Sequence, residues 1–301
     1  MSSVTGGCPL ALVILLLVSM EPTATYVVTL VSECDEFFLD ETPPEIPGKL
    51  EQKKFMDVRY KLICQKYNII KKFMTLYDTD KKIPVFSAYK YTGLTKLQTP
   101  VYSPWVLGTG VVKYFICNQD DDIKGDYNEQ DTYHKGHLFP VSHANSEEDL
   151  KSTYQLTNSD PQVGTFNQGR WSAMEKYFKK FMDENCTNDK KTVEAFIITG
   201  AIEGTDPSTE YLKQAINIPK ILWTAFCCKR SKGTFEGTAW DTNIENNGHK
   251  ILTMTLKDLN QILKVEPFSK NIVFIYYENA VGLMTHFEFR MTCPFIKLSF
   301  F

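Results

Sequence analysis

Short apolar runs separated by polar, turn-forming residues recur along most of the chain. The runs are rich in β-branched and aromatic side chains, which is the pattern of strands in a folded domain. We expect them to pair into one sheet. The expected strands cover residues 83–89, 111–117, 133–139, 193–202, 222–228 and 272–277.

Helical spacing of apolar residues predicts three helices before or between these strands. The first covers residues 49–74 with a break near Tyr67, and the others cover residues 167–184 and 256–264. Because helices and strands do not alternate strictly, their order favours an α+β fold over a doubly wound one. We therefore expect a mixed, largely antiparallel sheet with covering helices.

The beginning of the chain differs from the rest, because residues 9–18 form an unbroken apolar run. This run is too short to span a bilayer comfortably, and the small residues Thr23 and Ala24 offer a cleavage zone. We expect a signal peptide over residues 1–24, with an N-terminal anchor as the alternative. No later stretch of the sequence reaches the length of a membrane-spanning helix.

The remaining sequence divides into three parts. The prolines in the segment ETPPEIPG are incompatible with a regular helix. Residues 25–48 are therefore expected to form an extended arm over the domain. A single domain follows over residues 49–290. Residues 291–301 form a C-terminal tail.

Composition limits the classes of function. The 301 residues are 43% hydrophobic and 13% aromatic, which is enough to bury a sizeable core. Lys and Arg number 33 against 36 Asp and Glu, giving a net charge of −3. This balance excludes a histone-like polycation that binds nucleic acid by bulk charge. Any binding site for a polyanion must therefore be confined to a limited part of the protein surface.

Cysteine usage indicates an exported protein. Seven of the eight cysteines lie beyond the predicted signal peptide, and none forms a C-x-x-C pair suited to zinc. We expect disulfides and a secreted or secretory-pathway location. Because seven is odd, at least one thiol is free or pairs with another chain, which leaves a disulfide-linked extracellular binding module as one alternative function.

The segment YHKGHLFPVSHA carries the first candidate for chemistry. His137 follows a glycine within a strand pattern and precedes Pro140, which must end or edge that strand. Strand alternation places Lys135 beside His137 on one face and His134 on the other. Taken alone, His137 is better explained as a hydrogen-bonded core histidine, because histidine is often partly buried without a catalytic role. His143 and His249 are expected to be loop residues without metal-ligand spacing.

A second segment places an amide at the start of a helix. Turn-forming residues over 158–164 precede the helix, which opens near Asn167. Asn167 lies on the rim of the apolar face and Glu175 at its other margin, although Asn167 alone also fits an N-cap. The apolar face consists of Trp171, Met174, Phe178 and Phe181.

Together these segments resemble the DNA/RNA non-specific endonuclease family, whose members carry a DRGH motif, an N-x-x-P-Q segment and N-x-G-x-W followed by a glutamate. The wider chain is similar to the endonuclease domain-containing 1 branch, with ICQKY, LYDT, IPVFSAYKYTG, FNQG, ITGAI and LWTAFCC as further matching segments. The motif matches are Lys135-Gly136-His137, Asn158 to Gln162, Asn167 to Trp171, and Glu175.

The resemblance implies a ββα-metal (His-Me finger) core and hydrolysis of DNA and RNA without sequence preference, with a 5′-phosphate product. His137 would be the general base and Asn167 the ligand of Mg²⁺ or another divalent cation such as Mn²⁺. Glu175 would order a metal-bound water. Lys135 and Arg170 would bind the phosphate, although Arg170 with the nearby lysines equally fits a solvated helix face.

The chain departs from the family pattern at the residues that precede His137. The Asp and Arg of DRGH are His134 and Lys135 here. Lysine keeps the charge of arginine but loses its planar bidentate fork, which predicts a weaker grip on the transition state. A catalytically impaired protein that binds nucleic acid or another partner through the same scaffold is therefore the alternative to an active nuclease.

Overall fold

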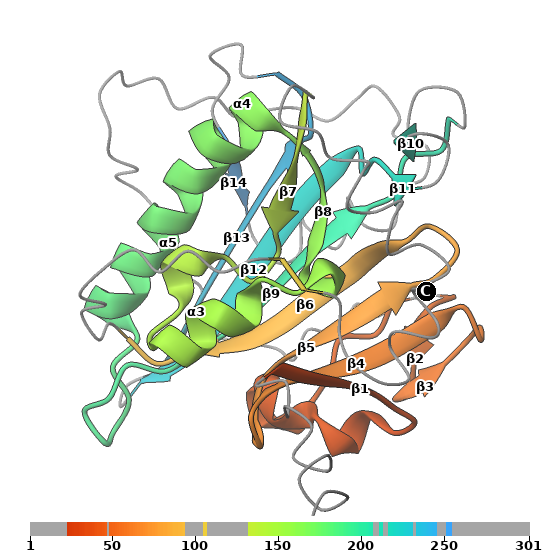
Figure 1. Cartoon of the computed structure of the whole chain (residues 1–301). Helices are drawn as coiled ribbons and strands as arrows, with labels where there is room; N and C mark the ends of the chain where they lie inside the picture. Colours follow the sequence, from red (N-terminus) through yellow and green to blue (C-terminus); the bar gives the residue numbers. More distant parts are fainter. Residues whose placement is uncertain are drawn as a thin grey trace, which may run out of the picture.

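The computed structural model describes residues 23–46, 48–93, 105–106, 132–206, 211–212, 216–230, 233–245 and 251–254. Its main feature is an eight-stranded sheet in the order β1-β4-β5-β6-β9-β12-β13-β14 (Figure 1). All neighbouring strands run antiparallel, which confirms the α+β class with a largely antiparallel sheet. The strands are β1 (Thr23–Val28), β4 (Tyr60–Tyr67), β5 (Ile70–Asp78), β6 (Ile83–Tyr91), β9 (Ala195–Ile202), β12 (Ile221–Arg230), β13 (Gly233–Thr242) and β14 (Leu252–Met254).

The central strands are buried on both faces, so their sequences are apolar almost without interruption. Successive side chains point to opposite faces of a sheet. In β6, Phe86 and Ala88 join one hydrophobic core, whereas Tyr89 and Tyr91 join the other. The sheet therefore separates two cores, each closed by a different part of the chain.

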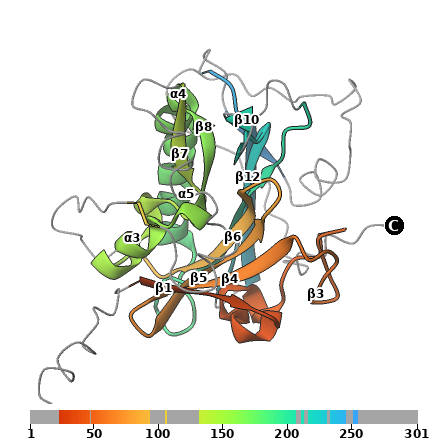
Figure 2. The same cartoon turned by 45° about the vertical axis from the view of Figure 1, so that its right-hand side comes forward.

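Helices and a two-stranded ribbon cover one face (Figures 1 and 2). The helices are α3 (Glu147–Thr153), α4 (Gly164–Phe166) and α5 (Ser172–Asn185), and short 3-10 turns η6 (Val141–His143) and η7 (Leu156–Asn158) connect them to the ribbon. The ribbon consists of β7 (Tyr133–His137) and β8 (Ser159–Val163) and is called ribbon β7–β8 below. This layer contains the motif residues.

N-terminal residues cover the opposite face. Val31 and Phe38 belong to the core on this side, and the Cys34–Cys64 disulfide ties the segment to β4. The first part of the predicted arm therefore belongs to the sheet itself, as strand β1. The covering elements are η3 (Val31–Glu33), η4 (Asp35–Phe37), η5 (Leu39–Glu41), β2 (Leu50–Glu51) and β3 (Lys54–Phe55). A separate two-stranded sheet consists of β10 (Tyr211–Leu212) and β11 (Ile216–Asn217).

Disulfides form within the described part of the chain, as cysteine usage predicted. Cys186, directly after α5, is bonded to Cys228 in β12 and so joins the helical layer to the sheet. Cys227 is disulfide-bonded as well. Cys117 and Cys293 lie outside the described residues.

The predicted helix over residues 49–74 is wrong. Most of this segment forms β4 and β5, joined at Asn68, which has a left-handed backbone with φ 54°. Because β4 is buried on both faces, Leu62, Ile63 and Cys64 are consecutive buried residues, and such a run also satisfies helical spacing. The predicted break near Tyr67 coincides with the turn between the strands.

Most other predictions on described residues agree with the structure. Strands were expected where β6, β7, β9 and β12 occur, and a helix where α5 occurs. Residues 159–163, expected to be part of a turn, instead form β8. No helix in the described part of the chain is long and apolar enough to cross a membrane. The predicted strands 111–117 and 272–277, helix 256–264, tail 291–301 and His249 lie outside the described residues, as does the signal peptide up to residue 22.

Candidate functional site

His137 is the last residue of β7 in ribbon β7–β8, where it pairs with Ser159. Strand alternation puts Lys135 on the same face as His137, and puts His134 and Gly136 on the opposite face. Lys135 and His137 both keep partial exposure, whereas Gly136 is buried. The ribbon thus presents the histidine and a cation together on one face.

Gly136 is required by the close approach of Gln162 across the ribbon. A Cβ atom at position 136 would lie 2.0 Å from Cδ of Gln162. Gln162 is fully buried, and its Nε2 donates to Oδ1 of Asp160 over 2.9 Å. The glycine before His137 and the glutamine of the N-x-x-P-Q segment therefore form one packing unit beside the histidine. Burial raises the pKa of Asp160 to about 7.

Asn158, the first residue of that segment, holds the chain that leaves His137. Its Oδ1 accepts from the Phe139 amide over 2.9 Å, and its Nδ2 donates to the carbonyls of Phe139 and Thr153 over 3.1 and 2.9 Å. Asn158 is completely buried. These bonds fix the backbone two residues beyond His137, so the asparagine orients the histidine rather than contacting a substrate.

The helix that carries Asn167 contains a π-helical turn. Helix α4 continues through the π turn Asn167–Trp171 into α5, and Gly169 has non-helical torsions of φ −92° and ψ −110°. Asn167 itself has helical torsions of φ −58° and ψ −52°, so it is not an N-cap. Single π turns within helices occur frequently at functional sites. Trp171, Met174 and Phe178 are buried and Phe181 packs beside them, as predicted.

Several contacts join ribbon β7–β8 to the start of this helix. The Gly164 amide donates to the Thr132 carbonyl over 2.8 Å, and a Cβ atom on Gly164 would lie 2.7 Å from the His134 ring. Gln168 Nε2 lies 3.3 Å from His134 Nδ1. His134, which replaces the family aspartate, therefore contacts the beginning of the helix and lies on the side of the strand opposite His137.

Asn167 is partly exposed, and its carboxamide has no hydrogen-bond partner among the described residues. A carboxamide oxygen that is not used by the protein is free to bind a hard cation. The sequence predicted this side chain as a metal ligand, and its surroundings are compatible with that role.

His137 lies between two aromatic rings. The centroid of its imidazole is 4.5 Å from the Trp105 ring and 4.9 Å from the Tyr154 ring. Although the residue keeps partial exposure, its Nε2 is buried and has no hydrogen-bond partner in the described part of the molecule. Burial lowers the pKa of His137 to about 3, so the imidazole is neutral at neutral pH.

Lys135 is half-buried on the same face as His137. Burial lowers the pKa of its ammonium group from the ordinary value, because desolvation disfavours the charged form. A phosphate beside Lys135 would favour the charged form again. The side chain is therefore suited to an anionic ligand that also removes water from the site.

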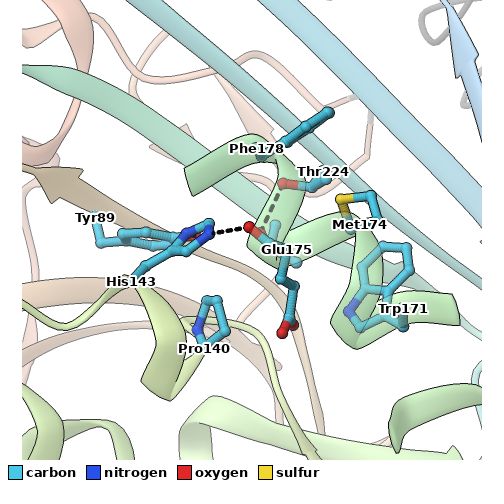
Figure 3. Close-up of a pocket in the computed structure, with 9 residues that line it drawn as sticks. Tyr89, Pro140, His143, Trp171, Met174, Glu175, Phe178 and Thr224 are labelled. Atoms are coloured by element: carbon cyan, nitrogen blue, oxygen red, sulfur yellow. Dashed lines mark hydrogen bonds between the residues drawn. The ribbon is translucent and has the colours of Figure 1, made fainter. Parts of the chain in front are cut away.

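Glu175 lies in the first turn of α5, eight residues beyond Asn167, and lines a small cavity (Figure 3). Burial raises the pKa of its carboxyl group to about 8, and the charge of Lys176 opposes this shift. The cavity of about 10 Å³ has room for roughly one water molecule. A cation near Glu175 would favour the ionised carboxylate. The other lining residues are Tyr89, Pro140, His143, Trp171, Met174, Phe178, Thr199 and Thr224.

The expectation that His143 is a simple loop residue is wrong. It ends the 3-10 turn η6 and is only 4% exposed. Its Nδ1 lies 2.7 Å from the Tyr89 hydroxyl and its Nε2 lies 2.9 Å from the Glu175 carbonyl oxygen (Figure 3). Burial lowers the pKa of His143 to about 4. The local sequence contains no signal for these contacts, because both partners are distant in the chain.

Arg170 does not have the position of a substrate-binding residue. It is 9% exposed, and its Nε donates to Asp241 over 2.5 Å. The terminal nitrogens donate to the carbonyls of Thr242, Ile244 and Glu245. This geometry contradicts the predicted contact with phosphate, because the guanidinium is committed to the end of β13. Arg170 instead anchors the π turn to the sheet.

Asn243 is a second anchor that the sequence did not reveal. Its Oδ1 accepts from the Val163 amide over 2.8 Å, and its Nδ2 donates to the carbonyls of Pro161 and Pro219 over 2.8 and 2.9 Å. The end of β13 therefore holds both β8 and the helix start. Its distance along the chain from the motifs explains why the motifs gave no sign of it.

The described residues contain no group of three or more His, Cys, Asp or Glu side chains arranged to hold a metal ion. Mg²⁺ keeps most of its waters and needs few protein oxygens. The partly exposed carboxamide of Asn167 provides one such oxygen.

Comparison with known proteins assigns the chain to a family. The profile of the DNA/RNA non-specific endonuclease family matches residues 51–271. The match covers most of the chain, and the protein belongs to this family. The resemblance inferred from the motifs is therefore confirmed.

The sequence is 24% identical over 264 residues to the human Endonuclease domain-containing 1 protein. It is 26% identical over 254 residues to the mouse protein of the same name. Each comparison covers 78% of this chain and 46% of the relative, so the chain spans about half the length of the curated relatives it matches.

A solved structure of similar fold is the EndoG/EndoGI complex, determined to explain the inhibition of EndoG. The match has a TM-score of 0.50 and 15% identity, and it covers 64% of this chain and 81% of that chain. At this level of identity the similarity establishes the fold alone.

Proposed function

We propose that this protein is a metal-dependent nuclease that hydrolyses phosphodiester bonds of DNA, and of RNA, without sequence specificity. The observations that carry the proposal are a neutral histidine at the end of β7 and, on the helix whose start contacts ribbon β7–β8, a carboxamide without a hydrogen-bond partner among the described residues. Membership of the DNA/RNA non-specific endonuclease family supports the same reaction.

His137 is the proposed general base. A neutral imidazole can take a proton from water at neutral pH, whereas an imidazolium cannot. Because Nε2 of His137 is buried, Nδ1 is the nitrogen that we assign to proton transfer. Trp105 and Tyr154 hold the ring in one orientation and exclude water from its buried side.

Asn167 and Glu175 would hold a divalent cation and its water shell, Asn167 directly and Glu175 through a water molecule. The cation, Mg²⁺ or Mn²⁺, would supply positive charge to the phosphate oxygens and the leaving oxygen. Lys135 contributes further positive charge on the open face of the ribbon. Arg170 is not part of the proposal, because its guanidinium is bonded to the protein.

We also propose that the protein acts in the secretory pathway or outside the cell. Disulfides persist in oxidising compartments, and this chain contains the Cys34–Cys64 and Cys186–Cys228 bonds. The apolar run at residues 9–18 agrees with a signal peptide.

A second candidate function is nucleic-acid binding without efficient cleavage. It is favoured by the replacement of the family Asp and Arg by His134 and Lys135. The aromatic cover on His137 favours it as well, since the rings of Trp105 and Tyr154 pack against the imidazole and restrict access to it. An impaired enzyme would bind plasmid DNA and leave it intact.

Cleavage assays separate the two functions. Purified protein is incubated with plasmid DNA and with RNA, in Mg²⁺ or in chelator, beside His137→Ala and the exposed control Lys176→Ala. We expect metal-dependent cleavage that His137→Ala lowers by about a hundredfold or more, which is the contribution of a general base. Lys176→Ala should cleave like the unmodified protein. Equal cleavage by His137→Ala would overturn the proposed role, and DNA binding without cleavage by the unmodified protein would favour the second function.

A further inference from the structure

We propose that His143 is a positioning residue for this site, because its two imidazole nitrogens connect the helix that carries Glu175 to strand β6. The inference rests on the proposed nuclease function and adds a residue that the family motifs do not contain. His143 contacts no candidate reacting group itself, and it acts through the backbone of Glu175 and through Tyr89.

The hydrogen bonds of His143 define its tautomer. The Glu175 carbonyl oxygen can only accept, so Nε2 of His143 must carry the proton and donate over 2.9 Å. In the neutral ring Nδ1 is then an acceptor, and the Tyr89 hydroxyl donates to it over 2.7 Å. Both nitrogens are used in one directed chain, from Tyr89 to His143 to Glu175.

Tyr89 also holds the chain that leaves His137. The Phe139 ring is stacked on Tyr89 with a centroid distance of 4.1 Å and an interplanar angle of 11°. Asn158 fixes the Phe139 backbone on both sides. Tyr89 therefore supports both sides of the site. It stacks on Phe139, which follows His137 in the chain, and it donates to His143, which binds the Glu175 carbonyl.

The chain of hydrogen bonds continues into the sheet. Thr199 of β9 hydrogen bonds to Tyr89, and Thr199 Oγ1 lies 2.9 Å from Thr224 Oγ1 of β12. Tyr89, Thr199 and Thr224 are all buried, and they line the cavity beside Glu175 (Figure 3). Residues of the three central strands β6, β9 and β12 thus support the His143 imidazole. The imidazole in turn holds helix α5 through its hydrogen bond to the Glu175 carbonyl.

This arrangement explains why a buried histidine occurs where a Leu or Phe would fill the space. A helix carbonyl oxygen has a second lone pair, so the bond from His143 adds to the hydrogen bonding of α5 rather than replacing it. Displacement of α5 by a fraction of an ångström would move Glu175 relative to His137. Groups that orient a catalytic constellation in this way commonly contribute 10- to 100-fold to activity or metal affinity.

Three variants test the proposal. His143→Phe keeps the ring shape and removes both hydrogen bonds. His143→Gln places an amide where Nε2 lies and can donate to Glu175 again. Tyr89→Phe removes one hydroxyl and leaves the stacking on Phe139, so it tests the chain even if His143→Phe does not fold.

The measurements are kcat and KM for cleavage, and Mn²⁺ affinity by electron paramagnetic resonance. We expect His143→Phe to lower kcat by about 10- to 100-fold with KM within about twofold, Tyr89→Phe to lower kcat less, and His143→Gln to recover part of the loss. Mn²⁺ binding should weaken in the same order. Unchanged kcat and unchanged Mn²⁺ affinity in a folded His143→Phe or Tyr89→Phe would overturn the proposal.

The same experiment distinguishes failure of the inference from failure of the proposed function. If the unmodified protein cleaves nothing but binds Mn²⁺, the nuclease assignment fails, and the effect of His143→Phe on Mn²⁺ affinity still decides the positioning role. If the unmodified protein neither cleaves nor binds Mn²⁺, both are overturned.

Discussion

His137 and His143 lie close together in the chain on either side of Pro140, and their surroundings are opposite in kind. His143 has a hydrogen-bond partner at each ring nitrogen, and both bonds lie inside the protein. His137 is held by the flat faces and edges of Trp105 and Tyr154, and its Nε2 has no partner among the described residues.

The difference indicates which histidine is available for chemistry. A buried polar group that is fully hydrogen-bonded stabilises the fold, whereas an unsatisfied one costs free energy and needs another explanation. By this argument His143 supports the structure around the site. His137 makes no such bonds among the described residues, and under the proposed function its Nδ1, rather than the buried Nε2, takes the proton from water.

The largest expected effect that separates the two histidines is on stability. At pH 7, His143→Phe should lower the free energy of unfolding by about 2 kcal/mol, because Tyr89 and the Glu175 carbonyl lose partners. His137→Phe removes a nitrogen that has no partner and should leave stability unchanged or slightly raised. Urea denaturation of the two variants measures this contrast, and a larger loss for His137→Phe would break the comparison.

Acidification extends the same experiment. The pKa values of His137 and His143, about 3 and about 4, lie below the ordinary value of 6.5, so the unfolded chain binds protons first as the pH falls. The stabilising contribution of each neutral ring is complete above pH 6.5. For His143 it is lost progressively as the pH falls from 6.5 to 4, by about 3 kcal/mol. His143→Phe should therefore show a correspondingly flatter loss of stability between pH 7 and pH 4.

The sequence predicted the α+β class and the motif segments, but it did not predict how the sheet is buried. Residues 49–74 satisfy helical spacing because β4 is apolar on both faces, and periodicity alone does not separate that case from a helix. The local sequence signal for a hairpin was Asn68, because asparagine is favoured at turn positions with a left-handed backbone, which it has here. For β7 and α5, in contrast, flanking glycine and proline and a one-sided apolar face made the assignment clear.

The candidate site divides in the same way. His137, Lys135, Asn167 and Glu175 could be proposed from the sequence because they occur within short motifs. The roles of His143, Trp105 and Asn243 depend on partners far away in the sequence, so no local pattern could reveal them. Arg170 was predicted to bind substrate because of its position in a motif. Its actual partner, Asp241, lies 71 positions further along the chain, where the motif gives no sign of it.

Removal of the aromatic cover should change the pKa of one histidine and leave that of the other unchanged. Trp105→Ala exposes the His137 ring to water, so its pKa should rise from about 3 by at least about one unit toward the ordinary value. The His143 ring packs against Tyr89 and Tyr91 instead, so His143 should keep its pKa. Proton NMR of the imidazole C2–H resonances during a pH titration measures both, with Trp105→Phe as the matched control. An unchanged His137 would mean that Trp105 does not cause its low pKa.

The smallest expected effect concerns the cation beside His137. Lys135→Arg restores the residue of the family motif, whose planar fork can donate two parallel hydrogen bonds to a phosphate. We expect kcat/KM for plasmid cleavage to rise about three- to tenfold, and Lys135→Gln, which keeps length without charge, to lower it. Both changes lie on the ribbon face of His137 and leave the Tyr89–His143–Glu175 chain untouched. A decrease with Lys135→Arg would indicate instead that the lowered pKa of the half-buried ammonium, which arginine cannot reproduce, is the property the site uses.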